Sequence, residues 1–145
     1  MKKIISLCLL LLFLASCQLL YVQEHNSSHI AEPEVVEAFQ ENSVKLEPVK
    51  SPQDDIFASE LNGVRPGIYE LNTKFIFIYE FDTPDDRENG EKAFAEKTAS
   101  MNLVSYSMFE NRNILIFYVH GEDVNSDSVP FETVIQKVLD SFIEG

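Results

Sequence analysis

The hydrophobic positions of the chain gather most strongly in two short segments, residues 74–81 and residues 113–120. The first has the sequence Phe-Ile-Phe-Ile-Tyr-Glu-Phe after Lys74, and the second contains Ile-Leu-Ile-Phe-Tyr-Val. β-Branched and aromatic residues dominate both segments, and apolar side chains occupy both of the faces that alternate along a strand. We therefore predict two central, well-buried strands.

A weaker segment accompanies each of these strands. Residues 64–71 contain a proline and a glycine, which favours a short strand at the edge of a sheet. Residues 103–109 alternate apolar and polar side chains, which is typical of a half-buried strand. Turns at residues 72–73 and 110–112 would join each weak strand to its central neighbour as a hairpin.

Three helices are predicted from their start signals and their periodicity. Thr83, followed by a proline and two acidic residues, is typical of an N-cap and first turn, and this helix should run to about residue 100. A similar signal at residues 51–54 predicts a short helix at about 52–62. After Pro130, apolar residues recur three and four positions apart, which predicts a third helix. These residues are Phe131, Val134, Ile135, Val138, Leu139, Phe142 and Ile143.

The predicted order of elements is therefore α-β-β-α-β-β-α. This order indicates an α+β fold in which a four-stranded, mainly antiparallel sheet has its helices packed on one face. An antiparallel sheet with one solvated face should alternate apolar and polar residues, but both central strands are apolar on both sides. The second face therefore needs a cover, which could be the short helix with the N-terminal segment, a second copy, a ligand or a protein partner.

Aromatic side chains on the predicted strands make up a candidate interaction surface. Large exposed apolar patches mark interaction sites, and tyrosine is enriched in protein interfaces. The candidate residues are Phe75, Phe77, Tyr79, Tyr106 and Tyr118.

The N-terminus has the pattern of a secretory signal. Lys2 and Lys3 precede an apolar run over residues 4–14 that is too short to cross a membrane and fits a secretory signal. The run ends in Leu14-Ala15-Ser16-Cys17, which resembles the lipobox of bacterial lipoproteins. The resemblance implies cleavage before Cys17, attachment of diacylglycerol to its thiol, and a lipid-anchored position on the extracytoplasmic face of the cell membrane. An ordinary signal peptide and an uncleaved anchor are the alternatives.

This resemblance divides the chain into three parts. Residues 1–16 would be the lipoprotein signal peptide, residues 17–52 the lipidated N-terminus and a flexible tether, and residues 53–145 a small α+β domain. The two cysteines are Cys8, which would leave with the signal, and Cys17, which would be alkylated. The mature domain would therefore fold without a disulfide.

The charge is strongly acidic, with 24 Asp and Glu residues against 11 Lys and Arg, a net charge of −13. Cleavage of the signal would remove Lys2 and Lys3, so that nine basic residues face 24 acidic ones and the net charge becomes −15. Nucleic-acid binders need a basic surface, so we expect no nucleic-acid partner. Anionic lipid would repel such a domain at short range.

No cofactor, metal site or catalytic residue is expected from the candidate chemistry. Residues 123–127 alternate oxygen ligands as in a calcium loop, but Ser128 replaces the turn glycine and Val134 occupies the position of the bidentate glutamate. His25 and His29 are four residues apart, with no third ligand nearby. Residues 82–91 hold an acidic cluster that the helix start explains. His120 is the only histidine of the predicted domain, and the nearby Ser and Asp residues fit no known catalytic spacing.

The sequence thus predicts a membrane-anchored extracytoplasmic lipoprotein that is not an enzyme and acts as a binding or interaction module. Its partners would be the membrane, through Cys17, and a protein or a second copy, through the sheet. A lipoprotein that binds a small ligand between sheet and helices is the alternative, and a hydrolase that uses His120 is a third possibility. In overall style the chain resembles small lipoproteins of Gram-positive, Bacillus-like bacteria, a resemblance that implies no particular activity.

Overall fold

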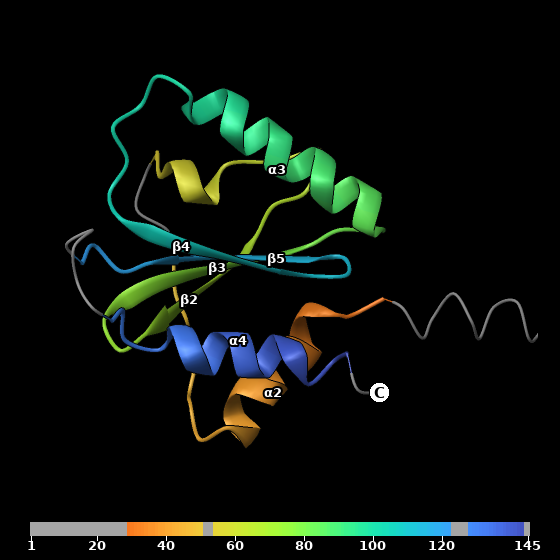
Figure 1. The fold of residues 1–145 in the computed structure, drawn as a ribbon, viewed down its shortest axis with the longest axis vertical. Helices are drawn as coiled ribbons and strands as arrows, with labels where there is room; N and C mark the ends of the chain where they lie inside the picture. The colour runs from red at the N-terminus through yellow and green to blue at the C-terminus, as the bar shows by residue number, and fades with distance from the viewer. Residues whose placement is uncertain (1–28, 51–53, 123–127, 144–145) are drawn as a thin grey trace, which may run out of the picture.

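A five-stranded antiparallel sheet forms the middle layer of the protein (Figure 1). The computed structural model describes residues 29–50, 54–122 and 128–143. The strand order is β1-β2-β3-β5-β4. The strands are β1 (Glu47–Pro48), β2 (Gly67–Leu71), β3 (Lys74–Glu80), β4 (Tyr106–Asn111) and β5 (Ile114–Val119). The overall α+β class is as predicted, and β3 and β5 lie at the centre of the sheet.

The fifth strand, β1, corrects the predicted count of four. It is only two residues long, and Glu47 and Pro48 pair with β2 at Glu70 and Tyr69. Next to it, the Val49 N–H donates to the carbonyl oxygen of Ile68 at 3.0 Å. A strand this short, with both residues exposed, leaves no hydrophobic pattern from which it could be recognised.

Helices cover both faces of the sheet, whereas the sequence analysis placed them on one face. The helices α2 (Glu32–Glu41) and α4 (Glu132–Asp140) lie on one side (Figure 1). The helix α3 (Pro84–Thr98) and the 3₁₀ helix η1 (Ile56–Ala58) lie on the other. The physical reason is the double apolar character of β3 and β5, which requires a cover on each side.

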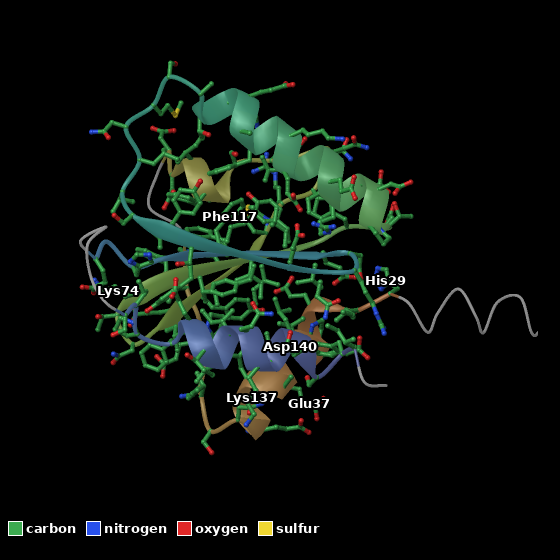
Figure 2. The ribbon with its side chains drawn as sticks, in the orientation of Figure 1. His29, Glu37, Lys74, Phe117, Lys137 and Asp140 are labelled. Atoms are coloured by element: carbon green, nitrogen blue, oxygen red, sulfur yellow. The ribbon has the colours of Figure 1, made fainter. Side chains whose placement is uncertain are left out.

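Each face has its own core. Aliphatic residues dominate the core under α2 and α4, where Ile76, Ile78, Ile114 and Ile116 are fully buried. Aromatic rings dominate the core under α3 and η1, where Phe117 lies with its ring centroid 4.4 Å from that of Phe94 (Figure 2). The alternation of side chains along β3 and β5 sends successive residues into these two cores.

The helix α2 lies in the segment that the sequence analysis assigned to the tether. Its Val35 and Phe39 are fully buried in the aliphatic core, and the preceding Ile30 is buried too. The Asn113 side chain holds Ile30 by accepting from its N–H at 2.8 Å and donating to its carbonyl oxygen at 2.9 Å. Residues 30–49 are therefore part of the fold, and the flexible segment cannot extend to residue 52.

Local signals at the helix starts are borne out in one case and corrected in another. The Thr83 hydroxyl accepts from the Asp86 N–H at 3.1 Å and caps α3, as predicted. In place of a helix at 52–62, the structure has the three-residue η1, capped by Asp55 through the Phe57 N–H at 2.9 Å. The predicted cap at Ser51 lies outside the described residues.

Candidate functional site

The predicted aromatic interaction surface is not a surface in this structure. Phe77 and Tyr79 are 0% exposed, Tyr118 is 1% exposed, and Phe75 and Tyr106 are half-buried. The four residues other than Tyr118 lie in the aromatic core under α3 and η1, and Tyr118 lies in the aliphatic core on the opposite face. The prediction was wrong in this respect because the chain covers both faces of the sheet with its own helices.

Tyr79 connects the sheet with η1 through its hydroxyl group. Its hydroxyl group donates to the carbonyl oxygens of Ser59, at 2.6 Å, and Phe57, at 3.0 Å. Burial raises the pKa of the Tyr79 hydroxyl above its ordinary value. This polar end of the side chain attaches η1 to the centre of the sheet.

The two edges of the sheet differ in how well they are blocked against pairing with another strand. The β1 edge is two residues long and includes Pro48, which is how natural sheets block an edge. The β4 edge is six residues long and has no proline, and no described strand lies beyond it. Unpaired N–H and C=O groups along such an edge are a template for pairing with another strand.

Exposed apolar side chains gather along the same stretch of chain. Among the described residues, the large apolar side chains that stand out to solvent are Met101, Val104, Met108 and Ile143, with exposures of 51%, 51%, 47% and 64%. All but Ile143 lie on β4 or on the segment that leads into it. An apolar concentration beside an unpaired strand is typical of an interaction site.

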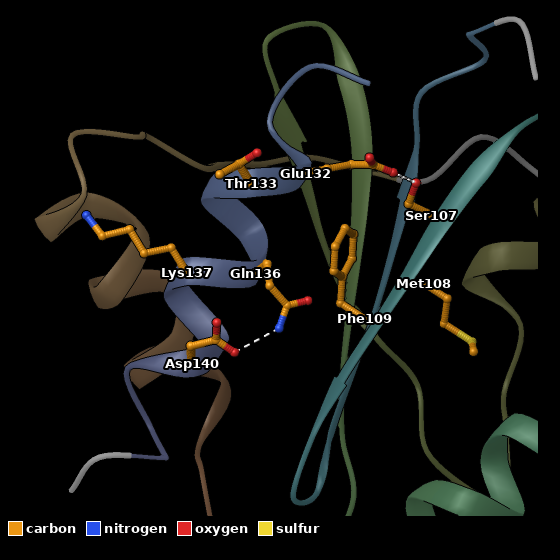
Figure 3. A pocket seen from close by; sticks show the side chains of 8 residues that line it. All are labelled: Ser107, Met108, Phe109, Glu132, Thr133, Gln136, Lys137 and Asp140. Atoms are coloured by element: carbon orange, nitrogen blue, oxygen red, sulfur yellow. Dashed lines mark hydrogen bonds between the residues drawn. The ribbon is translucent and has the colours of Figure 1, made fainter. Parts of the chain in front are cut away.

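A groove of about 800 Å³ lies between β4 and α4 (Figure 3). In it, the Ser107 hydroxyl donates to the Glu132 carboxylate, and Gln136 donates to Asp140 at 2.8 Å. Polar groups therefore line the groove on the α4 side, whereas Phe109 supplies an apolar wall. The lining residues are Ser107, Met108, Phe109, Glu132, Thr133, Gln136, Lys137 and Asp140.

His120 lies beside Ser107, one of the residues that line this groove, whereas the sequence analysis found no partner for it. The ring is 5% exposed, its Nε2 lies 3.4 Å from the Ser107 Oγ, and its Nδ1 accepts from the Glu122 N–H at 3.0 Å. A neutral imidazole that accepts at Nδ1 carries its proton on Nε2. In this tautomer His120 faces Ser107 with a donor, and the Ser107 hydroxyl donates to Glu132. A histidine base that activates a serine nucleophile must instead accept the proton of the serine hydroxyl.

A second charged cluster lies on the α3 side of β4. The guanidinium group of Arg87 is buried, its Nε donates to the Arg112 carbonyl oxygen at 2.8 Å, and its Nη1 pairs with both Glu91 and Glu110. Burial, followed by the hydrogen bond with Glu110, raises the pKa of Glu91 to about 7 in spite of the neighbouring Arg87. Beside this cluster a groove of about 460 Å³ is lined by both apolar and charged groups, including Glu91, Phe94 and Met108.

Sequence reasoning missed both clusters. Ser107 and Glu132 are 25 positions apart, and Glu91 and Glu110 are on different elements, so that only the tertiary fold brings them together. The alternation over residues 103–109 did indicate a strand. Its place at the sheet edge is set by the packing of the two hairpins, which the alternation does not specify.

The remaining sequence candidates lie apart from these features. Cys17, His25 and residues 123–127 are outside the described residues, and His29 lies beside Glu80, with Nε2 3.6 Å from the carboxylate oxygen. Within the described ranges there is no group of three or more His, Cys, Asp or Glu side chains placed to hold a metal ion. None of the helices described in the structure is long and apolar enough to span a bilayer.

The chain matches no known protein family, no curated protein and no solved structure.

Proposed function

We propose that the protein is an extracytoplasmic lipoprotein, anchored to the cell membrane through Cys17, whose folded part is an interaction module. The observation that carries the proposal is the order Lys2-Lys3, apolar run and Leu14-Ala15-Ser16-Cys17 at the N-terminus. A small residue pair before a cysteine, at the end of a short apolar run, is what lipid attachment and cleavage require.

The length of chain between the anchor and the fold is compatible with this proposal. Eleven residues separate Cys17 from His29, the first described residue. Covalent geometry limits such a stretch to about 40 Å when it is fully extended. The folded part would therefore stay close to the membrane, nearer than a tether that ends at residue 52 would keep it.

An interaction role draws support from the β4 edge, where an unpaired strand and exposed Met108 lie together. A small-ligand role is the second candidate, and the groove of about 800 Å³ between β4 and α4 favours it. That volume is within the usual range of small-molecule sites. The two roles differ in the β4 edge itself, which an interaction module uses for pairing and a ligand binder leaves solvated.

The anchor is tested by metabolic labelling with a fatty-acid analogue, followed by detergent phase separation of the full chain. We expect the wild-type protein to incorporate the label and to enter the detergent phase. Cys17→Ser should lose the label, because the thiol that takes the lipid is gone. An inhibitor of the lipoprotein signal peptidase should cause the uncleaved form to accumulate.

Cys8→Ser is the matched control, because Cys8 lies in the apolar run that would be cleaved away. This variant should be labelled and partitioned as the wild type is. If Cys17→Ser were labelled as strongly as the wild type, the lipoprotein assignment would be wrong.

A further inference from the structure

The backbone groups that face the open edge can be assigned from the strand register. The Phe81 N–H donates to the Asn113 carbonyl oxygen at 3.0 Å, so odd-numbered residues of β5 bond to β3 and even-numbered ones bond to β4. The β4 residues that pair with these even-numbered positions are Ser107, Phe109 and Asn111. The N–H and C=O groups of the alternate residues of β4 therefore point away from the sheet. These residues are Tyr106, Met108 and Glu110.

Met108 stands at the middle of this outward row. Its backbone groups point to the open edge, and its side chain, on the α3 side of the sheet, is 47% exposed. The groove beside α3 includes Met108 together with Phe94, Ala95 and Tyr106. A strand laid along β4 would find free hydrogen-bonding groups at Met108 and apolar surface on one side of it.

We propose that the occupant of this edge is a second copy of the same chain, which pairs β4 with β4 in antiparallel fashion around a twofold axis at Met108. This inference deepens the proposed interaction function by naming its partner, and it does not depend on the anchor at Cys17. The product is a continuous ten-stranded sheet, because each copy contributes the five strands that the structure describes.

The sequence of β4 is complementary to itself in this register. Met108 lies opposite Met108 of the second copy, and Glu110 lies opposite Tyr106, so that no two like charges face each other. Moving the register by two positions would place each Met108 opposite Glu110, or each Glu110 opposite its own copy after a further step. A move of two positions in the other direction would place Met108 opposite Tyr106 but would leave Glu110 opposite Val104, outside β4. The register around Met108 keeps both apolar pairing and the full length of the outward row.

The flanking helix adds charge complementarity. Because Glu132 contacts Ser107 and the Leu139 carbonyl oxygen accepts from Asn111, α4 runs parallel to β4. A twofold axis at Met108 therefore brings the Glu132 end of one α4 toward the turn of the other that holds Lys137. Figure 3 shows Glu132 directed toward Ser107 on β4 and Lys137 extending from the next turn on the other side of α4. The positive charge of each Lys137 would then reduce the repulsion between the acidic groups of the two helices.

The other edge does not compete for this pairing. The β1 edge is only two residues long and contains Pro48, which has no N–H to donate. The net charge, −13 for the full sequence and −15 without Lys2 and Lys3, opposes association of two copies, and this repulsion is screened over about 8–10 Å at physiological salt. We therefore expect a weak dimer that strengthens as salt is added.

The first test is sedimentation velocity on the chain from Gln18 onward, which contains every described residue and no cysteine. We expect the mass to rise from monomer toward dimer between about 10 μM and about 1 mM, because an interface of one short strand and its grooves is small. Met108→Lys should weaken the dimer by about tenfold or more, since a charged edge residue blocks strand pairing. Gln40→Lys, an equal charge change on the exposed face of α2, should leave the dimer close to wild type.

The second test is a disulfide that only the proposed register permits. In the same cysteine-free background, Met108→Cys should form a covalent dimer on oxidation, because paired residues at such a position have Cα atoms about 5.5 Å apart. Gln40→Cys is the control for random collision and should be oxidised to a dimer at least about tenfold more slowly.

A monomer at every concentration would overturn the proposal and would leave the edge to an extended segment of another protein. A dimer that Met108→Lys does not weaken, or equal crosslinking of the two cysteine variants, would overturn it as well, because the copies would then meet through another surface. All variants replace exposed residues, and thermal unfolding checks that each one folds. Loss of labelling at Cys17 has no bearing on these outcomes, so the anchor and the dimer can fail separately.

Discussion

Glu91 is the residue whose protonation most directly connects local geometry with stability. Its carboxyl group lies with that of Glu110 against the single guanidinium group of Arg87. Burial and the second carboxyl group raise its pKa from 4.5 to about 7. A proton held between two carboxyl groups removes their repulsion, so the folded state binds this proton more tightly than the unfolded state does.

The sign of the resulting pH dependence follows from linkage. Because the pKa is raised on folding, the contribution of Glu91 to the free energy of unfolding is complete below about pH 4.5 and is lost as pH rises through about 7. Glu91→Gln keeps the hydrogen-bonding shape of the protonated form at all pH values. We expect this variant to melt higher than wild type at pH 8, on the order of 5 °C, and close to wild type at pH 5.

Thermal unfolding at a series of pH values measures this difference. Glu88→Gln, on the exposed side of the same helix, is the control and should follow the wild-type curve at a constant offset. Melting curves of Glu91→Gln and wild type that stay parallel from pH 5 to pH 8 would show that Glu91 does not hold the proton.

Asn113 is the residue that joins the N-terminal segment to the sheet. Its side-chain amide donates to the carbonyl oxygens of Ile30 and Phe81, both at 2.9 Å, and its oxygen accepts from the Ile30 N–H. Asn113 is 1% exposed, so water does not replace these bonds when the side chain is removed.

Asn113→Ala should therefore lower the free energy of unfolding by about 2–4 kcal/mol, because three buried backbone groups lose their partners. Urea unfolding measures the change, and hydrogen exchange in α2 should rise with it. Asn102→Ala, an exposed asparagine on the loop before β4, should change stability by about 0.5 kcal/mol or less. A similarly small effect at Asn113 would mean that Ile30 is not held in the fold by this side chain.

At the scale of elements, α2 and α3 differ in what attaches them to the sheet. Val35, Ala38 and Phe39 give α2 a buried apolar face, whereas the middle of α3 approaches the sheet through Gly90. A side chain at Gly90 would lie 2.3 Å from the ring of Phe81. The glycine that weakens α3 as an isolated helix is the one that allows the close packing of helix and strand.

A single substitution in α2 tests whether this element belongs to the folded unit. Phe39→Ala should lower the free energy of unfolding by about 3–5 kcal/mol, because a fully buried ring leaves a cavity in the aliphatic core. Glu37→Ala, on the outer side of the same helix (Figure 2), should have little effect. If both variants unfolded at the wild-type urea concentration, α2 would be a detachable part of the tether.

At the scale of the whole molecule, the proposed dimer is compatible with two anchors in one membrane. In the register around Met108, the two Asn111 residues are six positions apart along the paired strands, which is about 20 Å. The chain enters each copy near that point, at Ile30 beside Asn113. Stretches of eleven residues that reach about 40 Å allow both copies to lie with β4 parallel to the membrane plane.

Neighbouring anchors would also favour the pairing. Two copies held on the same surface meet at a higher effective concentration than they do in solution, which compensates for a weak interface. The acidic charge acts in the opposite direction, and it would also keep the folded parts away from anionic lipid. Salt would therefore affect the distance from the membrane and the association of the copies together.

The amino-acid sequence by itself determined the elements that depend on local pattern. The apolar composition of β3 and β5, the Thr83 cap of α3 and the periodicity of α4 are each properties of neighbouring residues, and they were predicted without the fold. The lipobox at Cys17 is equally local, and it remains a prediction until it is tested.

Only the tertiary structure decided what covers the sheet and which of its parts stay open. The apolar character of β3 and β5 on both sides indicated that each face of the sheet must be covered. Contacts between residues far apart in the sequence determine that α2, η1 and α3 help to cover these faces. The same contacts buried Tyr79 and Tyr118, which had been assigned to a surface, and left β4 with no further strand beside it among the described residues. Packing brings together residues that local pattern treats separately, and for that reason the candidate interface became visible only in the folded chain.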